Sequence, residues 1–257
     1  DRGSAMRRID PYMLGVLLGD GSLHHGNVSV CTPDPEIVRE IQLYAQKVGS
    51  RIRVEPIPGN KATNYFFKGR EIGYANEFVR DSIRAMGLAV PCGEKHVPEC
   101  YKTAPIRTRI EILAGLLDTD GHLSRAGYEF CSKSPRLADD VTFIARSLGF
   151  AAYQSVKIVN GVEYRRISIS GDCSWLPLRI VRKRAPERNQ IKDVLVTGFK
   201  VEPVGDGIYH GFTLDGDHLY LDGSFTVHHN SGKTILFSRL ADDIQPQRTL
   251  ILAHREE

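Results

Sequence analysis

Two similar stretches decide the fold, MLGVLLGDG at Met13–Gly21 and LAGLLDTDG at Leu113–Gly121. Each is an apolar segment with an internal glycine, and each ends in Asp-Gly. The final acids, Asp20 and Asp120, lie 100 positions apart, and the match continues without a gap. Further pairs at this offset are Leu23 with Leu123, Cys31 with Cys131, Pro35 with Pro135 and Gly49 with Gly149. A repeat this regular predicts a duplicated domain.

The apolar spacing predicts the same order of elements in both halves. A helix is expected to begin at Pro35 after a cap at Asp34, and another at Pro135 after a cap at Ser134. Glycines 49 and 149 would end these helices. Strands are expected at 27–31, 51–56, 64–68, 128–131, 151–159 and 163–170, with a further helix near 71–86. The sequence therefore predicts an α+β fold of two repeats, which does not by itself exclude a duplicated domain without catalytic activity.

The two Asp-Gly motifs have a chemistry that follows from their form. Gly15 and Gly115 have no side chain, so the two apolar helices can approach closely, and Asp20 and Asp120 then emerge together at the helix C-termini. A helix C-terminus carries partial negative charge, so two carboxylates there favour a bound cation such as Mg²⁺. The simpler alternative is that each Asp-Gly only ends a helix. Two copies in register favour the metal site.

These motifs resemble the paired motifs of the LAGLIDADG homing endonucleases in their single-chain form, over residues of about 10–191. The second copy matches seven of the nine positions, whereas the first has Leu18 and Gly19 where the family has an acid and alanine. The resemblance implies a pseudo-twofold fold with saddle-shaped sheets, and a monomer that cuts double-stranded DNA with Mg²⁺ or Mn²⁺. It assigns the metal to Asp20 and Asp120, with the carbonyl groups of Gly19 and Thr119 as further ligands.

Family members carry a lysine near the shared site, in a Lys-x-x-Pro segment. Lys95 begins such a segment here, and Lys183 is its expected counterpart in the second half. Each is predicted to be catalytic by stabilising phosphate charge or tuning the attacking water, although either lysine could instead lie in a solvated loop. The surrounding basic run predicts phosphate contacts, with a solvated surface as the alternative. Its members are Arg179, Arg182, Lys183, Arg184 and Arg188.

A change in composition after about residue 195 predicts another domain over 196–230. The segment is rich in Gly and Asp, and it ends in a motif that resembles the C-terminal splicing region of inteins. In that chemistry Asn230 attacks its own carbonyl group, while His218 and His229 give acid–base help. Ser231 supplies the hydroxyl nucleophile that receives the upstream flank. The resemblance implies a β-rich piece of an intein (Hint) domain that uses no cofactor.

Residues 231–257 resemble part of a superfamily 2 helicase, the expected C-terminal flank of the intein. Ser231–Thr234 matches only the end of a P-loop, so ATPase activity is not expected. The first splicing motif is missing, so we expect a truncated or split intein that needs an N-terminal intein fragment in trans. Residues 1–7 are interpreted as a cloning scar or linker before an endonuclease at 8–195, with repeats at about 10–100 and 105–192. The expected DNA target is a homing site in a helicase gene.

Composition sets wider bounds. The chain has 257 residues, a net charge of +3 and five cysteines. No CxxC pair or membrane-spanning run occurs, which predicts a cytoplasmic, intracellular protein with reduced thiols and no membrane partner. The mild positive charge permits a nucleic-acid partner without requiring one. A DNA-binding or structural module that no longer cuts, attached to a split-intein fragment, is the alternative function.

Overall fold

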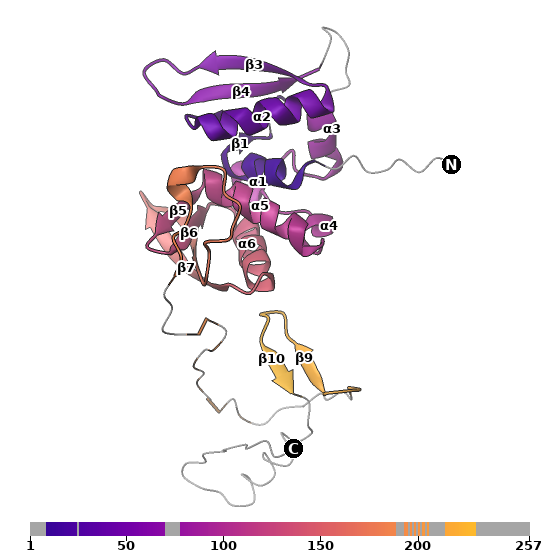
Figure 1. The fold of residues 1–257 in the computed structure, drawn as a ribbon, viewed down its shortest axis with the longest axis vertical. Helices are drawn as coiled ribbons and strands as arrows, with labels where there is room; N and C mark the ends of the chain where they lie inside the picture. The colour runs from indigo at the N-terminus through magenta and orange to yellow at the C-terminus, as the bar shows by residue number, and fades with distance from the viewer. Residues whose placement is uncertain are drawn as a thin grey trace, which may run out of the picture. The chain divides into compact units, whose positions relative to one another are not determined.

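The computed structural model describes residues 9–24, 26–69, 78–188 and 214–229, together with residues 193, 194, 196, 198, 200, 202, 203 and 205 (Figure 1). The chain divides into two compact units, Asp1–Gly198 and Phe199–Glu257. Each unit is described by itself below.

The first unit contains the two predicted repeats. The first repeat has α1 (Pro11–Asp20), β1 (Gly21–Ser22), β2 (Ser29–Thr32), α2 (Pro35–Val48), β3 (Arg51–Pro56), β4 (Thr63–Lys68) and α3 (Phe78–Ala85). The second has α5 (Ile106–Thr119), β5 (Gly121–Ser124), β6 (Gly127–Ser132), α6 (Pro135–Ser147), β7 (Ala151–Val159) and β8 (Val162–Ser170). The 3₁₀ turn η1 (Cys92–Glu94) and helix α4 (Glu99–Lys102) connect them, and the 3₁₀ turn η2 (Val181–Lys183) follows β8.

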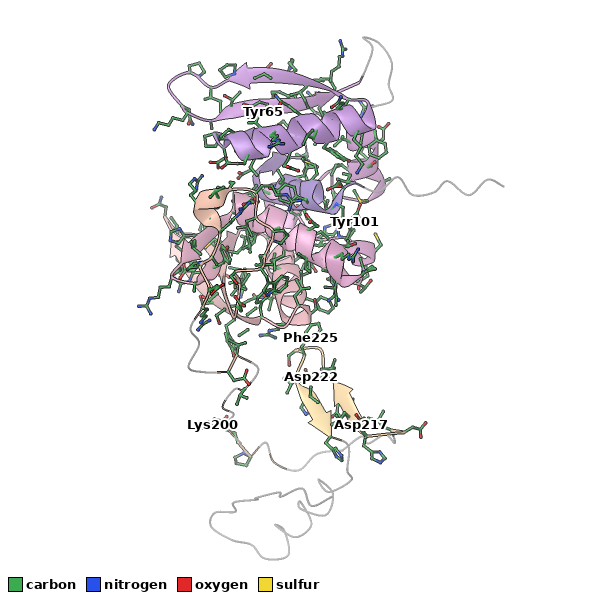
Figure 2. The ribbon with its side chains drawn as sticks, viewed as in Figure 1. Tyr65, Tyr101, Lys200, Asp217, Asp222 and Phe225 are labelled. Carbon is green, nitrogen blue, oxygen red and sulfur yellow. The ribbon has the colours of Figure 1, made fainter. Side chains whose placement is uncertain are left out.

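Each repeat forms a four-stranded antiparallel sheet with the same strand order. The first sheet runs β1-β2-β4-β3 and the second β5-β6-β8-β7. One helix covers one face of each sheet, and α2 lies along β3 and β4 in Figure 1. The edge-to-face contact of Tyr44 with Phe67, 6.1 Å between ring centroids, is part of this layer. Tyr65 of β4 also packs against the core (Figure 2). The predicted duplication of an α+β unit is therefore confirmed.

The helix ends follow the sequence signals, with one exception. Ser134 accepts a hydrogen bond from the backbone N–H of Leu137 at 3.2 Å and so caps α6 as predicted. Gly49 has a φ of 69°, the left-handed conformation that ends α2. The expected side-chain cap at Asp34 is wrong, because its carboxylate forms an ion pair with Arg182 instead.

The strands 51–56 and 151–159 lie where the sequence placed them. The short first strands β1 and β5 were not predicted, because each begins at its motif glycine and is too short to show a period of two. Of the expected helix at 71–86, residues 78–85 form α3, and the earlier part lies outside the described residues. Among the described residues no helix is long and apolar enough to cross a membrane. All five cysteines are free thiols.

The second unit contributes a short hairpin of β9 (Leu219–Leu221) and β10 (Val227–His229). The turn between them carries Asp222 and Phe225 (Figure 2). The carboxylate of Asp222 accepts hydrogen bonds from the backbone N–H groups of Ser224 and Thr226, at 2.8 and 2.9 Å. The predicted short strands are present here, while the wider intein domain is not shown by the described residues.

Candidate active site

The two motif helices α1 and α5 cross at their glycines. A Cβ atom placed on Gly15 would lie 2.3 Å from the carbonyl oxygen of Ile112, and one placed on Gly115 would lie 2.2 Å from that of Tyr12. Real side-chain atoms do not come this close to backbone, so only glycine fits at either position. The two distances obey the offset of 100, which shows that the helices meet around a pseudo-twofold axis. This contact carries the last residues of both helices to one place.

The crossing of α1 and α5 places Asp20 and Asp120 together at the C-terminal ends of the two helices. Asp20 is half-buried at the end of α1, while Asp120, the cap of α5, is more accessible. Burial and, to a smaller extent, the charge of Asp120 together raise the pKa of Asp20 to about 6. Burial also raises the pKa of Asp120. The two carboxylates therefore repel each other in a partly desolvated place, the condition under which a divalent cation binds favourably.

Lys95 closes the end of α1. Its Nζ donates to the carbonyl oxygens of Leu18 and Gly19 at 2.9 Å, and to that of Gly21 at 2.8 Å. The side chain is buried, which lowers the pKa of Lys95, while the nearby carboxylates oppose this shift. A cation at the negative end of a helix is stabilised by the helix dipole.

Lys183 closes the end of α5 in the same way. Its Nζ donates to the carbonyl oxygens of Asp118 and Thr119, both at 2.7 Å. Burial lowers the pKa of Lys183, and the charges of Asp118 and Asp20 oppose the shift. The structure therefore brings together the two carboxylates and the two lysines that the sequence singled out, one of each kind per repeat.

The residues fit a divalent cation with oxygen ligands. Within the described residues no group of three or more His, Cys, Asp or Glu side chains gathers to hold a metal, so Asp20 and Asp120 are the side chains available here. Two carboxylates suit Mg²⁺, which keeps several waters and binds phosphate oxygens. The carbonyl groups of Gly19 and Thr119 already accept from the lysines. Each carbonyl oxygen has a second lone pair, and their assignment as ligands stays a prediction.

The basic run does not act as one surface. Arg179 is half-buried: its guanidinium lies 3.9 Å from the centroid of the Tyr12 ring and forms a 2.7 Å ion pair with Glu111. This internal role argues against the predicted phosphate contact, because the charge is already paired. Arg182 pairs with Asp34, and Arg184 is exposed, with Nε donating to the carbonyl oxygen of Leu178. Arg188 is partly exposed.

Sequence reasoning missed Asp118. This carboxylate is 1% exposed and accepts hydrogen bonds from the Tyr12 hydroxyl at 2.8 Å and from the N–H groups of Arg179 and Ile180 at 2.7 and 3.2 Å. The counterpart position in the first repeat holds Leu18, also buried. That acid is part of the motif, but nothing in the sequence pointed to its partners, which lie 106 and 61 positions away.

Further basic side chains lie on the open face of each sheet, the face opposite to α2 or α6. On the first sheet the guanidinium of Arg53 lies 4.6 Å from the centroid of the Phe66 ring, beside Lys68 on the same face. On the second sheet Arg166 donates to Ser155 at 3.3 Å. These faces are opposite to the sheet faces that α2 and α6 cover, on which Phe67 and Ile167 lie. Both sheets therefore present polar and basic side chains on the face that no helix covers.

The hairpin of the second unit holds two of the predicted splicing residues. The rings of His218 and His229 meet edge to face with centroids 6.0 Å apart. His228 lies on the other face of β10 and contacts Asp222 at 3.0 Å, a pair that the sequence did not suggest. Asn230 and Ser231 lie outside the described residues, as does the proposed helicase segment at 231–257.

Comparison with known proteins agrees with this architecture. Residues 107–175 match the family described as the LAGLIDADG-like domain. The matched residues lie within the second repeat, and the first repeat has the same strand order and equivalent glycine and lysine contacts.

Two curated relatives are similar to this chain. Over 154 residues it is 29% identical to a replicative DNA helicase DnaB of Mycobacterium intracellulare, covering 60% of this chain and 21% of the helicase. Over 250 residues it is 26% identical to the homothallic switching endonuclease of Saccharomyces cerevisiae, covering 83% of this chain and 42% of that protein. The chain thus spans less than half the length of either relative.

Solved structures with similar chains include the homing endonuclease I-DmoI in complex with DNA and Mn. That comparison has a TM-score of 0.43 at 14% identity and covers 64% of this chain and 90% of the other. Full-length DUF199/WhiA from Thermatoga maritima gives a TM-score of 0.45 at 11% identity, covering 66% of this chain and 53% of the other.

Proposed function

We propose that residues 9–188 are a homing endonuclease that makes a site-specific double-strand break in DNA with Mg²⁺ or Mn²⁺. The observation that carries the proposal is the meeting of Asp20 and Asp120 at the ends of two helices in glycine contact, with one lysine closing each end. Two equivalent sets of groups suit two scissile phosphates, one on each strand. A single chain therefore supplies both, which supports a monomer as the active form.

The roles of the residues follow from their charge and place. Asp20 and Asp120 would hold the metal, which when bound supplies an activated water and stabilises the leaving oxygen. Lys95 and Lys183 place positive charge beside the phosphate, where negative charge develops during cleavage. The substitution of Leu18 for the family's acid does not remove a ligand, since Leu18 is buried in the core. This supports a working nuclease over a module that only binds DNA.

The proposed DNA surface consists of the open sheet faces. Arg53, Lys68 and Arg166 stand on these faces, where side chains can reach phosphates and base edges in the major groove. Arg182, Arg184 and Arg188 remain candidates for phosphate contacts, and Arg179 is left out because of its internal contacts. The similarity to a DnaB helicase over 60% of this chain supports a target inside a helicase gene.

The test uses supercoiled plasmid carrying the helicase gene without the insertion. We expect linear product in Mg²⁺ and none in EDTA. Asp20→Asn and Asp120→Asn should each slow cleavage by at least about a thousandfold, since each removes a charged ligand of the metal that would activate the attacking water. Both variants should still bind a DNA fragment that contains the site, which a gel mobility shift would measure. Specific binding by the unmutated protein without any cutting would leave only the DNA-binding module.

A second function is proposed for the hairpin of the other unit, on the contact between His218 and His229. Residues 196–230 would be the C-terminal part of an intein, with Asn230 cyclising and Ser231 receiving the upstream flank. The test mixes the chain with a matching N-terminal intein fragment and looks for a ligated product by mass spectrometry. Asn230→Ala should abolish this product, and no ligation with a genuine partner would contradict the proposal.

A further inference from the structure

Asp118 is the most deeply buried charged side chain beside the candidate site. The side chain is 1% exposed, and its oxygens accept three hydrogen bonds, from Tyr12 Oη and from the N–H groups of Arg179 and Ile180. A buried carboxylate needs such partners to remain ionised. Its position is therefore fixed by α1 on one side and by the 179–180 backbone on the other.

The backbone that Asp118 holds leads directly to Lys183. The N–H of Lys183 donates to the carbonyl oxygen of Ile180 at 3.0 Å, which forms the 3₁₀ turn η2. The ammonium of Lys183 then returns to the main-chain carbonyl of Asp118 at 2.7 Å. Asp118 thus contacts the Lys183 segment twice. Its carboxylate accepts from the backbone N–H groups at the beginning of the turn, and its main-chain carbonyl oxygen accepts from the ammonium group of Lys183.

The first motif helix takes part through Tyr12. Its hydroxyl donates to Asp118, and its ring lies under the guanidinium of Arg179, which also pairs with Glu111. The pseudo-twofold counterparts of Asp118 and Tyr12 are two buried apolar residues, Leu18 of the first repeat and Ile112 of the second. The carboxylate-based anchor therefore exists for one lysine and not for the other.

Lys95 is held by different groups. The hydroxyl of Ser134 donates to the carbonyl oxygen of Lys95 at 2.6 Å, and the N–H of Val97 donates to Asp140 at 2.8 Å. Both acceptor and donor come from the beginning and middle of α6. A change at Asp118 should consequently leave the Lys95 segment in place.

We propose that Asp118 is a positioning residue for Lys183, and that its loss weakens cleavage of one DNA strand selectively. The inference rests on the proposed function for its effect on DNA, and on the hydrogen bonds above for the effect on the segment. In Asp118→Asn the amide oxygen accepts fewer hydrogen bonds than the carboxylate, and its NH₂ group faces backbone donors. At least one N–H is then unpaired, and the η2 turn and its lysine shift.

The first experiment follows both strands of a labelled plasmid on denaturing gels. Asp118→Asn should slow one strand by roughly 10-fold to 100-fold, as expected for a misplaced catalytic group, and the other by less than about twofold. Nicked circles should accumulate. The slow strand should be the same as in Lys183→Met and the opposite of that in Ser134→Ala. Equal slowing of both strands by Asp118→Asn would overturn the proposal.

Tyr101→Phe is the matched control for stability. It removes a buried hydrogen bond of 2.6 Å, from the Tyr101 hydroxyl to the carbonyl oxygen of Ile9, and this bond involves no residue of 94–98 or 178–184. Any loss of activity through general destabilisation should therefore affect both strands equally in this variant. The same one-sided nicking by Tyr101→Phe would count against a specific role of Asp118.

Amide hydrogen exchange gives a second measurement that needs no cleavage. In Asp118→Asn, peptides over 178–184 should exchange at least about tenfold faster, while peptides over 94–98 should not change. Unchanged exchange at 178–184 would overturn the positioning role even if cleavage were altered. If the unmutated protein does not cut DNA, the proposed function fails, and the exchange result alone still decides whether Asp118 holds the Lys183 segment.

Discussion

In the first repeat the segment that carries Lys95 is held by α6 of the other repeat, whereas in the second the segment that carries Lys183 is held by its own repeat. Ser134 and Asp140 provide the anchors for the former. Asp118 and the Tyr128 hydroxyl, which donates to the carbonyl oxygen of Lys183 at 2.7 Å, provide those for the latter. Both ammonium groups nevertheless reach equivalent carbonyl oxygens. The chemistry needs equal end points, and the anchors are free to differ.

The helix contact between the repeats shows the opposite behaviour. At Gly15 and Gly115 the two copies are the same, because each glycine meets backbone of the opposite helix, which cannot move aside as a side chain can. Duplicated positions that must satisfy one shared geometry remain alike. The contrast with the anchors leads to three predictions beyond those above.

The largest effect is expected at this contact. Gly15→Ala and Gly115→Ala should each lower the free energy of unfolding by at least about 3 kcal/mol, since overpacking against backbone forces the helices apart. Urea denaturation followed by circular dichroism measures the change. Gly93→Ala is the control, because a Cβ there would lie 3.9 Å from a single side-chain atom of Lys133. Unequal losses at Gly15 and Gly115 would break the equivalence of the two helices.

The next effect concerns pH in the metal-free protein. The pKa of Asp20 is about 6 in the folded state against 3.8 for an aspartate in the unfolded chain, so the folded protein holds this proton more tightly. Its contribution to stability is present below pH 4 and is lost as the pH rises through about 6. In EDTA at pH 8, Asp20→Asn should therefore be more stable than the unmutated protein by about 1–3 kcal/mol.

Thermal unfolding from pH 4 to pH 8 would test this, with the two proteins compared at each pH. The difference should vanish near pH 4. Added Mg²⁺ should also reduce it at pH 8, because a ligand that binds only the folded protein stabilises it by mass action. A difference that does not depend on pH would mean that Asp20 is not held in a carboxylate-rich, partly buried place.

The smallest effect separates the two anchors. Tyr12→Phe keeps the ring under Arg179 but removes one donor to Asp118, and should lower stability by about 1–3 kcal/mol, the cost of losing one buried hydrogen bond to a carboxylate. Ile112→Val at the counterpart position removes one methylene and should cost about 1 kcal/mol. Hydrogen exchange at 178–184 should increase in Tyr12→Phe alone. An increase in both variants would show that the segment responds to general loosening.

Much of the fold followed from local signals. The duplication, the two motif helices, the helices that begin at Pro35 and Pro135, and most strands could be predicted from periodicity and from caps. The exception at Asp34 has a tertiary cause, because its carboxylate finds a partner 148 positions away. Local preference for a cap is worth about 1 kcal/mol, so a distant ion pair can replace it.

Some residues of the candidate site could likewise be predicted from the sequence, and others could not. Asp20 and Asp120 were identified by motif and spacing, and Lys95 and Lys183 by resemblance to the family; the structure brings the four together. The contacts of Asp118 and Tyr128, and the contact of the Ser134 hydroxyl with Lys95, could not be predicted, since a carboxylate or hydroxyl in a sequence gives no indication of which distant backbone group it will contact. The structure also pairs Arg179 with Glu111, a contact that the sequence did not indicate.

The sequence by itself determined that two equivalent helices end in acids, because an internal repeat and an Asp-Gly ending are local and periodic features. Only the tertiary structure decided how each lysine is held over its helix end. The reason is physical: the repeat constrains what lies on the pseudo-twofold axis, whereas contacts away from the axis join residues that are distant in sequence and need not be the same in both halves. There the first repeat has Leu18 and the second has Asp118.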